Sequence, residues 1–257
     1  MTAAVASSGL GALPGFGGLV RKEMTEWRRG RRAWVVLIVA TLFMALTAMN
    51  AWLNAELAPA EEAEQFSLDP ITNLAIAVSA QIFVVIAIFA VMSLIISERE
   101  SGTLAWTASK PVSRSAIWLA KWVSSTAMLG LLALLIPLVV TAVEVVVLYG
   151  PLPILPIVIM AIGALMAIAL FVALGLASAT VVTSQAAVAA IGLGVLFLPQ
   201  LVGALLPIAE YLPTSILEWS LKVASGQPAG PATPVSWALT VAALVAFSLG
   251  RMERMEL

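Results

Sequence analysis

The chain is divided by the charged segment Ser97-Glu98-Arg99-Glu100-Ser101-Gly102-Thr103-Leu104, which is followed by Lys110-Pro111-Val112-Ser113-Arg114 and Lys121. Long apolar runs lie on both sides of this segment, and few charges occur elsewhere in the second half of the chain. Runs of roughly 20 apolar residues match a hydrocarbon core of about 30 Å. The segment is therefore predicted to be a short loop at a membrane surface, where a soluble partner can reach it.

The composition defines the class of protein. Hydrophobic residues make up 61% of the 257 residues and charged residues only 11%, which is far from the average of soluble domains. This predicts an all-α polytopic membrane protein. The chain contains no cysteine and no histidine, which excludes disulfides, thiolate chemistry and histidine-based catalysis or metal binding. The net charge of −1 gives no indication of a nucleic-acid partner.

Apolar runs predict six transmembrane helices in one domain. The predicted spans cover residues 33–53, 71–97, 116–148, 152–178, 185–207 and 235–250. A polar break at 178–185 separates the fourth span from the fifth. Residues 1–15 are predicted to form a flexible tail, and residues 16–257 a single six-span domain.

The basic residues predict the orientation of the spans. All of the 13 Lys and Arg residues except Lys222 fall on one side of the six predicted spans, and residues 54–70 contain none. Cytoplasmic loops carry the excess of basic residues. Both termini are therefore predicted to lie in the cytoplasm, with the protein in the cell membrane.

An amphipathic stretch, 16–32, precedes the first span. Its apolar side chains recur at spacings of three and four residues: Phe16, Leu19, Val20, Met24 and Trp27. Charged residues occupy most of the other positions. This pattern predicts a helix in the cytoplasmic interface with Trp27 at headgroup depth. The alternative is that the stretch only supplies the charge that orients the protein.

Local signals within residues 98–115 predict a short cytoplasmic helix between the second and third spans. Ser97 and Glu100 have the spacing of a capping box, and Gly102 permits close backbone approach or a sharp bend. Pro111 stops a helix, and Ser113 is placed to cap the third span. The alternative is an ordinary loop that carries orienting charges.

Three residues at the start of the third span predict its position at the membrane surface. Trp118 and Trp122 are expected to lie at the interface, with Lys121 extending between them toward water.

Taken together, these motifs resemble the permease subunits of ABC-2 type transporters. The resemblance rests on the basic helix before the first span, the Glu-Arg-Glu-x-Gly-Thr-Leu segment and the Pro-Val-Ser-Arg segment, and it covers nearly the whole chain. In that family this loop is the coupling helix that docks into the ATPase subunit. The resemblance implies that these residues couple to the ATPase: Glu98, Arg99, Glu100, Gly102, Thr103, Leu104, Pro111 and Arg114. The stretch Ala105-Trp106-Thr107 departs from the more aliphatic family pattern.

The same resemblance implies the partners of the chain: two ATPase subunits and a second permease subunit, identical or homologous. The chain has no Gly-x-x-x-x-Gly-Lys-Ser/Thr phosphate loop, so ATP and Mg²⁺ are expected on the ATPase and no cofactor on this chain. The resemblance favours export. It also implies that the outer connection, 209–234, forms re-entrant helices that shape a gate. The alternative is an external loop.

Two polar residues within the apolar runs are candidates for the translocation path. Glu144 is the only acidic residue well inside such a run, and Gln81 is a weaker candidate. Glu144 alternatively reaches the outer interface. Catalysis by the chain itself is not expected, because histidine is absent and Asp69 is the only aspartate. The remaining alternatives are a secondary transporter or a membrane-anchor subunit without an ATPase partner.

Overall fold

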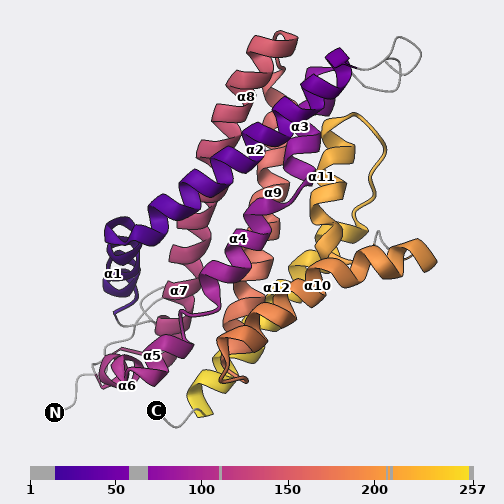
Figure 1. Cartoon of the computed structure of the whole chain (residues 1–257). Coiled ribbons are helices and arrows are strands. Elements are labelled where there is room, and N and C mark those ends of the chain that lie inside the picture. Colours follow the sequence, from indigo (N-terminus) through magenta and orange to yellow (C-terminus); the bar gives the residue numbers. More distant parts are fainter. Residues whose placement is uncertain (1–14, 58–68, 110–111, 207, 209–210, 255–257) are drawn as a thin grey trace, which may run out of the picture.

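The computed structural model describes residues 15–57, 69–109, 112–206, 208 and 211–254, and every regular element in these ranges is a helix (Figure 1). The α-helices of the first half are α1 (Phe16–Arg29), α2 (Arg31–Leu57), α3 (Pro70–Ser79), α4 (Ile82–Val91), α5 (Ile96–Glu100), α6 (Thr103–Ala108) and α7 (Arg114–Leu129). A π-helix, η3 (Gly130–Leu135), follows. The remaining elements are α8 (Ile136–Tyr149), α9 (Ile154–Ala179), α10 (Gln185–Leu205), the 3₁₀ turn η5 (Pro213–Ser215), α11 (Ile216–Ala224) and α12 (Ala232–Arg254).

Five helical stretches of the described chain are long and apolar enough to cross a membrane: Arg31–Asn54, Pro70–Glu100, Arg114–Tyr149, Ile154–Ala179 and Ala232–Arg254. They coincide with five of the six predicted spans, so the prediction of a multi-pass helical protein is confirmed. The predicted fifth span, 185–207, corresponds to α10. Its described apolar part, Gln185–Phe197, is shorter than a span requires, so the sixth crossing stays a prediction.

The second and third spans are interrupted, although the sequence predicts continuous helices there. Gln81, between α3 and α4, has a φ of 53°, which is unusual for a residue with a side chain. In the third span the π-helix η3 precedes Pro137. Proline has no N–H to bond to the carbonyl four residues earlier, and a widened turn accommodates this missing bond.

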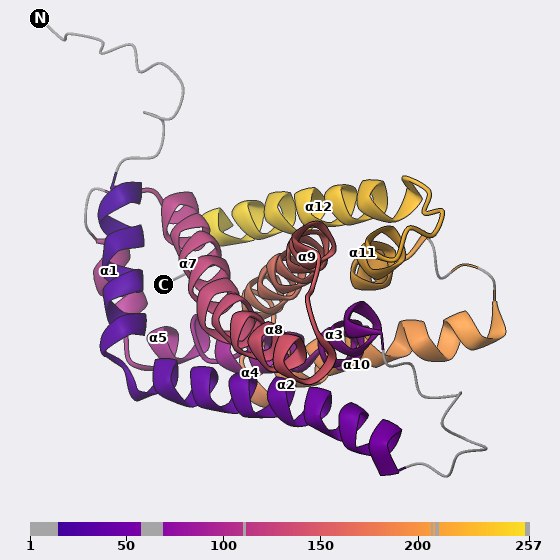
Figure 2. The ribbon, with the colours of Figure 1, turned by 90° about the horizontal axis from the view of Figure 1, so that it is seen from above.

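Helix α9 lies at the centre of the bundle (Figures 1 and 2) and packs against α4, α7, α10, α11 and α12. Helix α1 lies across the end of α2 and packs on α7. A helix thus forms over 16–29 of the predicted 16–32, whereas its location in the membrane interface stays a prediction. Its buried residues are Leu19, Glu23 and Trp27, which recur every four residues and so share one side of the helix.

The outer connection also contains a helix. Helix α11 buries Ile216, Leu217, Ser220 and Ala224 and packs mainly on α9. The two backbones approach closely because Gly163 of α9 has no side chain: a Cβ there would overlap the side chain of Ser220. Residues 209–210 of the connection lie outside the described part.

Candidate functional site

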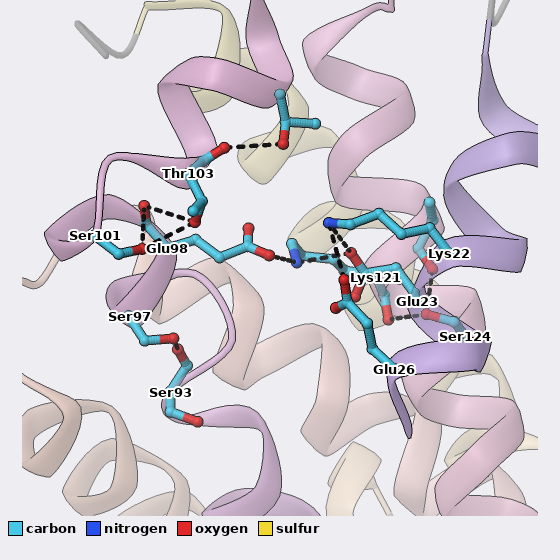
Figure 3. Close-up of polar contacts among 12 residues, drawn as sticks. Lys22, Glu23, Glu26, Ser93, Ser97, Glu98, Ser101, Thr103, Lys121 and Ser124 are labelled. Carbon is cyan, nitrogen blue, oxygen red and sulfur yellow. Dashed lines mark hydrogen bonds and ion pairs between the residues drawn. The ribbon is translucent and has the colours of Figure 1, made fainter. Parts of the chain in front are cut away.

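The charged segment of the sequence meets α1 and α7 at Lys121. The Nζ of Lys121 lies 2.7 Å from Oε1 of Glu98 and 3.0 Å from Oε1 of Glu23 (Figure 3). These three side chains come from α7, α5 and α1, respectively. They are separated by 23 and 98 positions in the sequence, so the cluster exists only in the folded protein.

Burial makes this cluster energetically important. The side chain of Lys121 is 2% exposed, that of Glu23 is 6% exposed and that of Glu98 is 19% exposed. Removing one partner of a buried ion pair leaves an uncompensated charge and typically costs about 3–5 kcal/mol. The two carboxylates thus hold α5 and α1 on opposite sides of the same ammonium group.

A second lysine joins the cluster from its exposed side. The Nζ of Lys22 lies 3.4 Å from Glu26 and 3.8 Å from Glu23. Glu26 is 56% exposed, and an exposed pair at this helical spacing contributes only about 0.3–0.5 kcal/mol. The carboxylate oxygens of Glu23, Glu26 and Glu98 lie within 4.8 Å of one another. Lys121 and Lys22 contact these carboxylates, so we interpret the arrangement as an ion-pair network rather than a metal site.

The predicted environment of Lys121 is wrong. Lys121 points into protein and is not extended toward water between two interfacial tryptophans. Trp118 is fully buried and its ring stacks on that of Trp122 at a centroid distance of 6.2 Å. Trp122 Nε1 donates a hydrogen bond to the carbonyl of Ala169, 3.0 Å away. The reason is that α1 and α9 cover this part of α7, which the sequence of the third span cannot reveal.

Trp27 packs against the bundle, and its predicted depth in the membrane stays a prediction. Trp27 is only 4% exposed, because α1 turns this side chain toward the bundle. The guanidinium of Arg32 lies over its ring, 5.6 Å from the centroid. Arg32 also donates to the carbonyl of Ala90 at 3.3 Å and to Ser93 Oγ at 3.2 Å, which fixes the start of α2 against the end of α4.

The predicted short helix is two helices joined at Gly102. This glycine has a φ of 71°, the left-handed conformation that glycine adopts easily, so the predicted bend is confirmed. The predicted capping box is wrong. The chain is already helical at Ile95, and Ser97 Oγ donates to the carbonyl of Ser93 rather than starting a new helix with Glu100.

The predicted coupling residues fall into two groups. Arg99 Nη1 donates to the carbonyl of Ala179 at the end of α9, at 3.4 Å. Arg114 donates to the carbonyls of Met252 and Glu253 at the end of α12, at 3.4 and 3.2 Å. Arg99, Arg114 and Glu98 therefore make contacts between helices of this chain.

The second group is exposed or not described. Glu100, Gly102 and Thr103 are exposed, and Trp106 of α6 is 63% exposed. Pro111 lies outside the described residues, as does the side chain of Leu104. The exposed members form a polar surface with one large aromatic ring, and Thr103 and Trp106 border a cavity that the Lys121 cluster also lines.

A cavity of about 570 Å³ separates α1 from α5 and α6. Its lining includes Glu26, Thr103, Trp106 and all three members of the Lys121 cluster. The Lys121 cluster thus lies at the edge of a cavity between α1 and the pair α5 and α6.

The two candidates for a translocation path lie apart from this cluster. Gln81 is at the break between α3 and α4, and Glu144 is half-buried in α8. A hydrogen bond near these candidates involves two other residues. Tyr149 Oη donates to Oδ1 of Asn73 at 3.1 Å and so connects α8 to α3.

Sequence reasoning missed Glu23, and it named Lys121 without its partners. A signal for Glu23 exists, because it lies four residues after Leu19 and four before Trp27 on the apolar side of α1. A carboxylate on a buried stripe requires a buried cation, although the sequence does not identify which lysine provides it.

Comparison with known proteins agrees with this architecture. The sequence model of a family described as "ABC-2 family transporter protein" matches residues 18–247, and no curated protein matches the chain. The matched region extends from α1 into α12 and includes the Lys121 cluster. The membrane subunits of this family are not catalytic themselves. The chain therefore belongs to the ABC-2 family of transporter membrane proteins.

Proposed function

We propose that this chain is the membrane-spanning subunit of an ATP-driven exporter and that Lys121 transmits the motion of α5 and α6 to α1 and α7. The observation that carries the proposal is the double contact of Lys121, at 2.7 Å to Glu98 and 3.0 Å to Glu23. A displacement of α5 moves the carboxylate of Glu98 relative to the ammonium group of Lys121, and so changes how strongly Lys121 is attracted to Glu98 and to Glu23. Because both carboxylates bind one ammonium group, α1 and α7 respond to the same displacement.

Membership of the family implies ATPase partners. We infer two ATPase subunits that bind ATP and Mg²⁺, and a second membrane subunit, identical or homologous. In this assembly residues 16–257 form one domain, with an interfacial helix at 16–32, a coupling loop at 98–115 and an outer connection at 209–234. Export is the direction that the family resemblance favours.

Contacts at the α5–α6 end support a sixth crossing. Arg99 contacts the end of α9 and Arg114 contacts the end of α12, so α9 ends beside α5 and α12 ends beside the start of α7. Five residues separate the end of α9 from the start of α10. After α10 the chain reaches α11, which packs against Gly163 in the N-terminal half of α9, away from the end of α9 that Arg99 contacts. A membrane crossing by α10 would connect these two ends of α9. The basic residues around α1 and α5 favour the cytoplasm for the α5–α6 end and for both termini, in the cell membrane.

The ATPase contact is proposed for the exposed side of α5 and α6. Glu100, Thr103 and Trp106 are accessible there, whereas Glu98, Arg99 and Arg114 are engaged within the chain. The latter three therefore act as positioning residues. Aromatic side chains are enriched at the centres of protein interfaces, which favours Trp106 as the main contact.

The outer connection is proposed as a gate, with α11 closing the space beside α9. Its burial of Ile216 and Leu217 supports a position among the spans, because irregular backbone at membrane depth survives only when protein covers it. Gln81 and Glu144 remain candidates for the translocation path.

The test is affinity purification of the tagged chain from detergent-solubilised membranes, followed by mass spectrometry and an ATPase assay. We expect an ATPase to copurify near one-to-one. Changing Glu98 to Gln is expected to uncouple ATP hydrolysis from transport while the complex remains intact. Purification of the chain without any ATPase would contradict the proposal and favour a secondary transporter or an anchor subunit.

A further inference from the structure

The basic residues near α1 are divided between two environments. Lys22 pairs with Glu26 beside the cavity, and Arg32 contacts Ala90 and Trp27. The other arginines of this region are exposed and make no ion pair within the part of the chain that the structure describes. We call these residues the arginine patch: Arg21, Arg28, Arg29 and Arg31, of which Arg31 also borders the cavity.

Helical geometry turns much of this patch away from the bundle. Arg21 and Arg28 are seven residues apart, so they lie on the same side of α1. The side that packs toward α7 is the stripe of Leu19, Glu23 and Trp27. The acidic residues of α1, Glu23 and Glu26, pair with Lys121 and Lys22. The guanidinium groups on the outward side have no carboxylate partner among the described residues.

The arginine patch continues directly into an apolar ridge of α2. Trp34, Ile38, Leu42 and Leu46 recur every four residues and are 65%, 53%, 57% and 65% exposed. They belong to the candidate span Arg31–Asn54, where exposed apolar side chains suit a hydrocarbon environment. Trp34 is the first ring of the ridge and suits the headgroup boundary. The patch thus lies at the level where phosphate groups of a membrane are found.

We propose that the arginine patch binds the phosphate groups of anionic phospholipids in the leaflet at the α5–α6 end. A guanidinium group presents a planar fork of donors that matches phosphate. Basic clusters next to a transmembrane helix attract anionic lipid headgroups. An acidic protein would also carry the negative charge that the patch attracts. It would not explain why the patch adjoins an exposed apolar ridge that begins at Trp34, whereas a membrane lipid would.

Such binding would also act on the Lys121 cluster, because Glu23 is part of α1. An anionic lipid that holds α1 at the membrane fixes one of the two carboxylates around Lys121. This consequence rests on the proposed function, whereas the binding itself does not.

The experiment uses the purified full chain in detergent, without any ATPase, so that its failure is distinct from failure of the proposed function. Native mass spectrometry measures the binding of phosphatidylglycerol and of phosphatidylcholine. We expect the Arg28→Gln/Arg31→Gln variant to bind phosphatidylglycerol about 25-fold more weakly, because each basic residue near an anionic membrane surface contributes about a fivefold factor. Binding of phosphatidylcholine should be unchanged.

A matched control changes two arginines near the C-terminus of the chain. Arg251 and Arg254 are exposed in the last turn of α12, and their change to Gln should weaken phosphatidylglycerol binding less than the change of Arg28 and Arg31 does. Equal losses in the two double variants would overturn the proposal. So would a patch variant that keeps its phosphatidylglycerol binding, or equally strong binding of inorganic phosphate.

A second variant covers the case in which the Gln variant fails to fold. Arg28→Lys/Arg31→Lys keeps both charges and should retain most of the phosphatidylglycerol binding, which should weaken as salt is raised. Binding that does not respond to salt would contradict a phosphate site.

Discussion

The Nζ of Lys121 lies 2.7 Å from Oε1 of Glu98, although 23 positions separate the two residues. This contact joins the first turn of α5 to the second turn of α7 across α6 and the loop that follows it. Glu23 binds the same ammonium group from α1. A single buried lysine therefore connects α5 with two other helices of the bundle, α1 and α7.

Loss of Lys121 should destabilise the fold strongly. Lys121→Met leaves Glu23 and Glu98 buried against each other, and we expect the free energy of unfolding to fall by about 3–5 kcal/mol. Denaturant unfolding in detergent, followed by circular dichroism, measures this change. The double variant Lys121→Met/Glu98→Gln should be less destabilised than the sum of its single variants. Strict additivity would show that the two side chains do not interact.

Two glutamates of α1 should behave differently despite their proximity. Glu23 is 6% exposed and contacts Lys121, whereas Glu26 is 56% exposed and contacts Lys22. We expect Glu23→Gln to lower the transport obtained per ATP hydrolysed and Glu26→Gln to leave it nearly unchanged. The measurement is simultaneous transport and ATP hydrolysis in proteoliposomes that also contain the ATPase subunits. Equal effects of the two changes would argue against a specific role of Glu23.

Gly163 should tolerate no side chain unless α11 is altered as well. A Cβ at this position overlaps Ser220, so Gly163→Ala should push α11 from α9 and cost about 1–3 kcal/mol. Ser220→Gly removes the obstructing atoms and should restore much of the lost stability. Gly194 of α10 is the control, because a Cβ there meets nothing within 4 Å. The variants are Gly163→Ala, Ser220→Gly, the double variant of these two, and Gly194→Ala. Their thermal unfolding distinguishes a local clash from a general effect of alanine.

The bend at Gly102 should depend on the backbone alone. Its φ is 71° and a Cβ would meet nothing within 4 Å, so Gly102→Ala introduces strain without a clash. The left-handed conformation costs an ordinary residue roughly 1–2 kcal/mol, and asparagine adopts it more readily. We therefore expect Gly102→Asn to keep more ATPase coupling than Gly102→Ala. The ratio of transport to hydrolysis measures this, and the opposite order would refute a conformational role.

Local features were predicted well where neighbouring residues decide them. Ser113 is an example: its Oγ accepts from the N–H of Ala116 at 3.0 Å, as the spacing indicates. The capping box of Ser97 and Glu100 has an equally good local pattern, but it fails because α5 begins at Ile96, so Ser97 already lies inside the helix. A helix boundary depends on both flanks, and the capping pattern describes only one of them.

Composition and hydrophobic length by themselves determined that this protein is a multi-pass helical membrane protein, because about 30 Å of hydrocarbon requires a run of apolar residues that the sequence displays directly. The charged segment and its resemblance to the permeases likewise determined the family. Only the tertiary structure decided the partners of Lys121, the burial of Trp27 and Trp118, and the close approach of Ser220 to Gly163. These features arise where α1 and α11 fold back onto α7 and α9. The physical reason is that burial and charge pairing depend on residues far apart in the chain, which no local pattern can bring together.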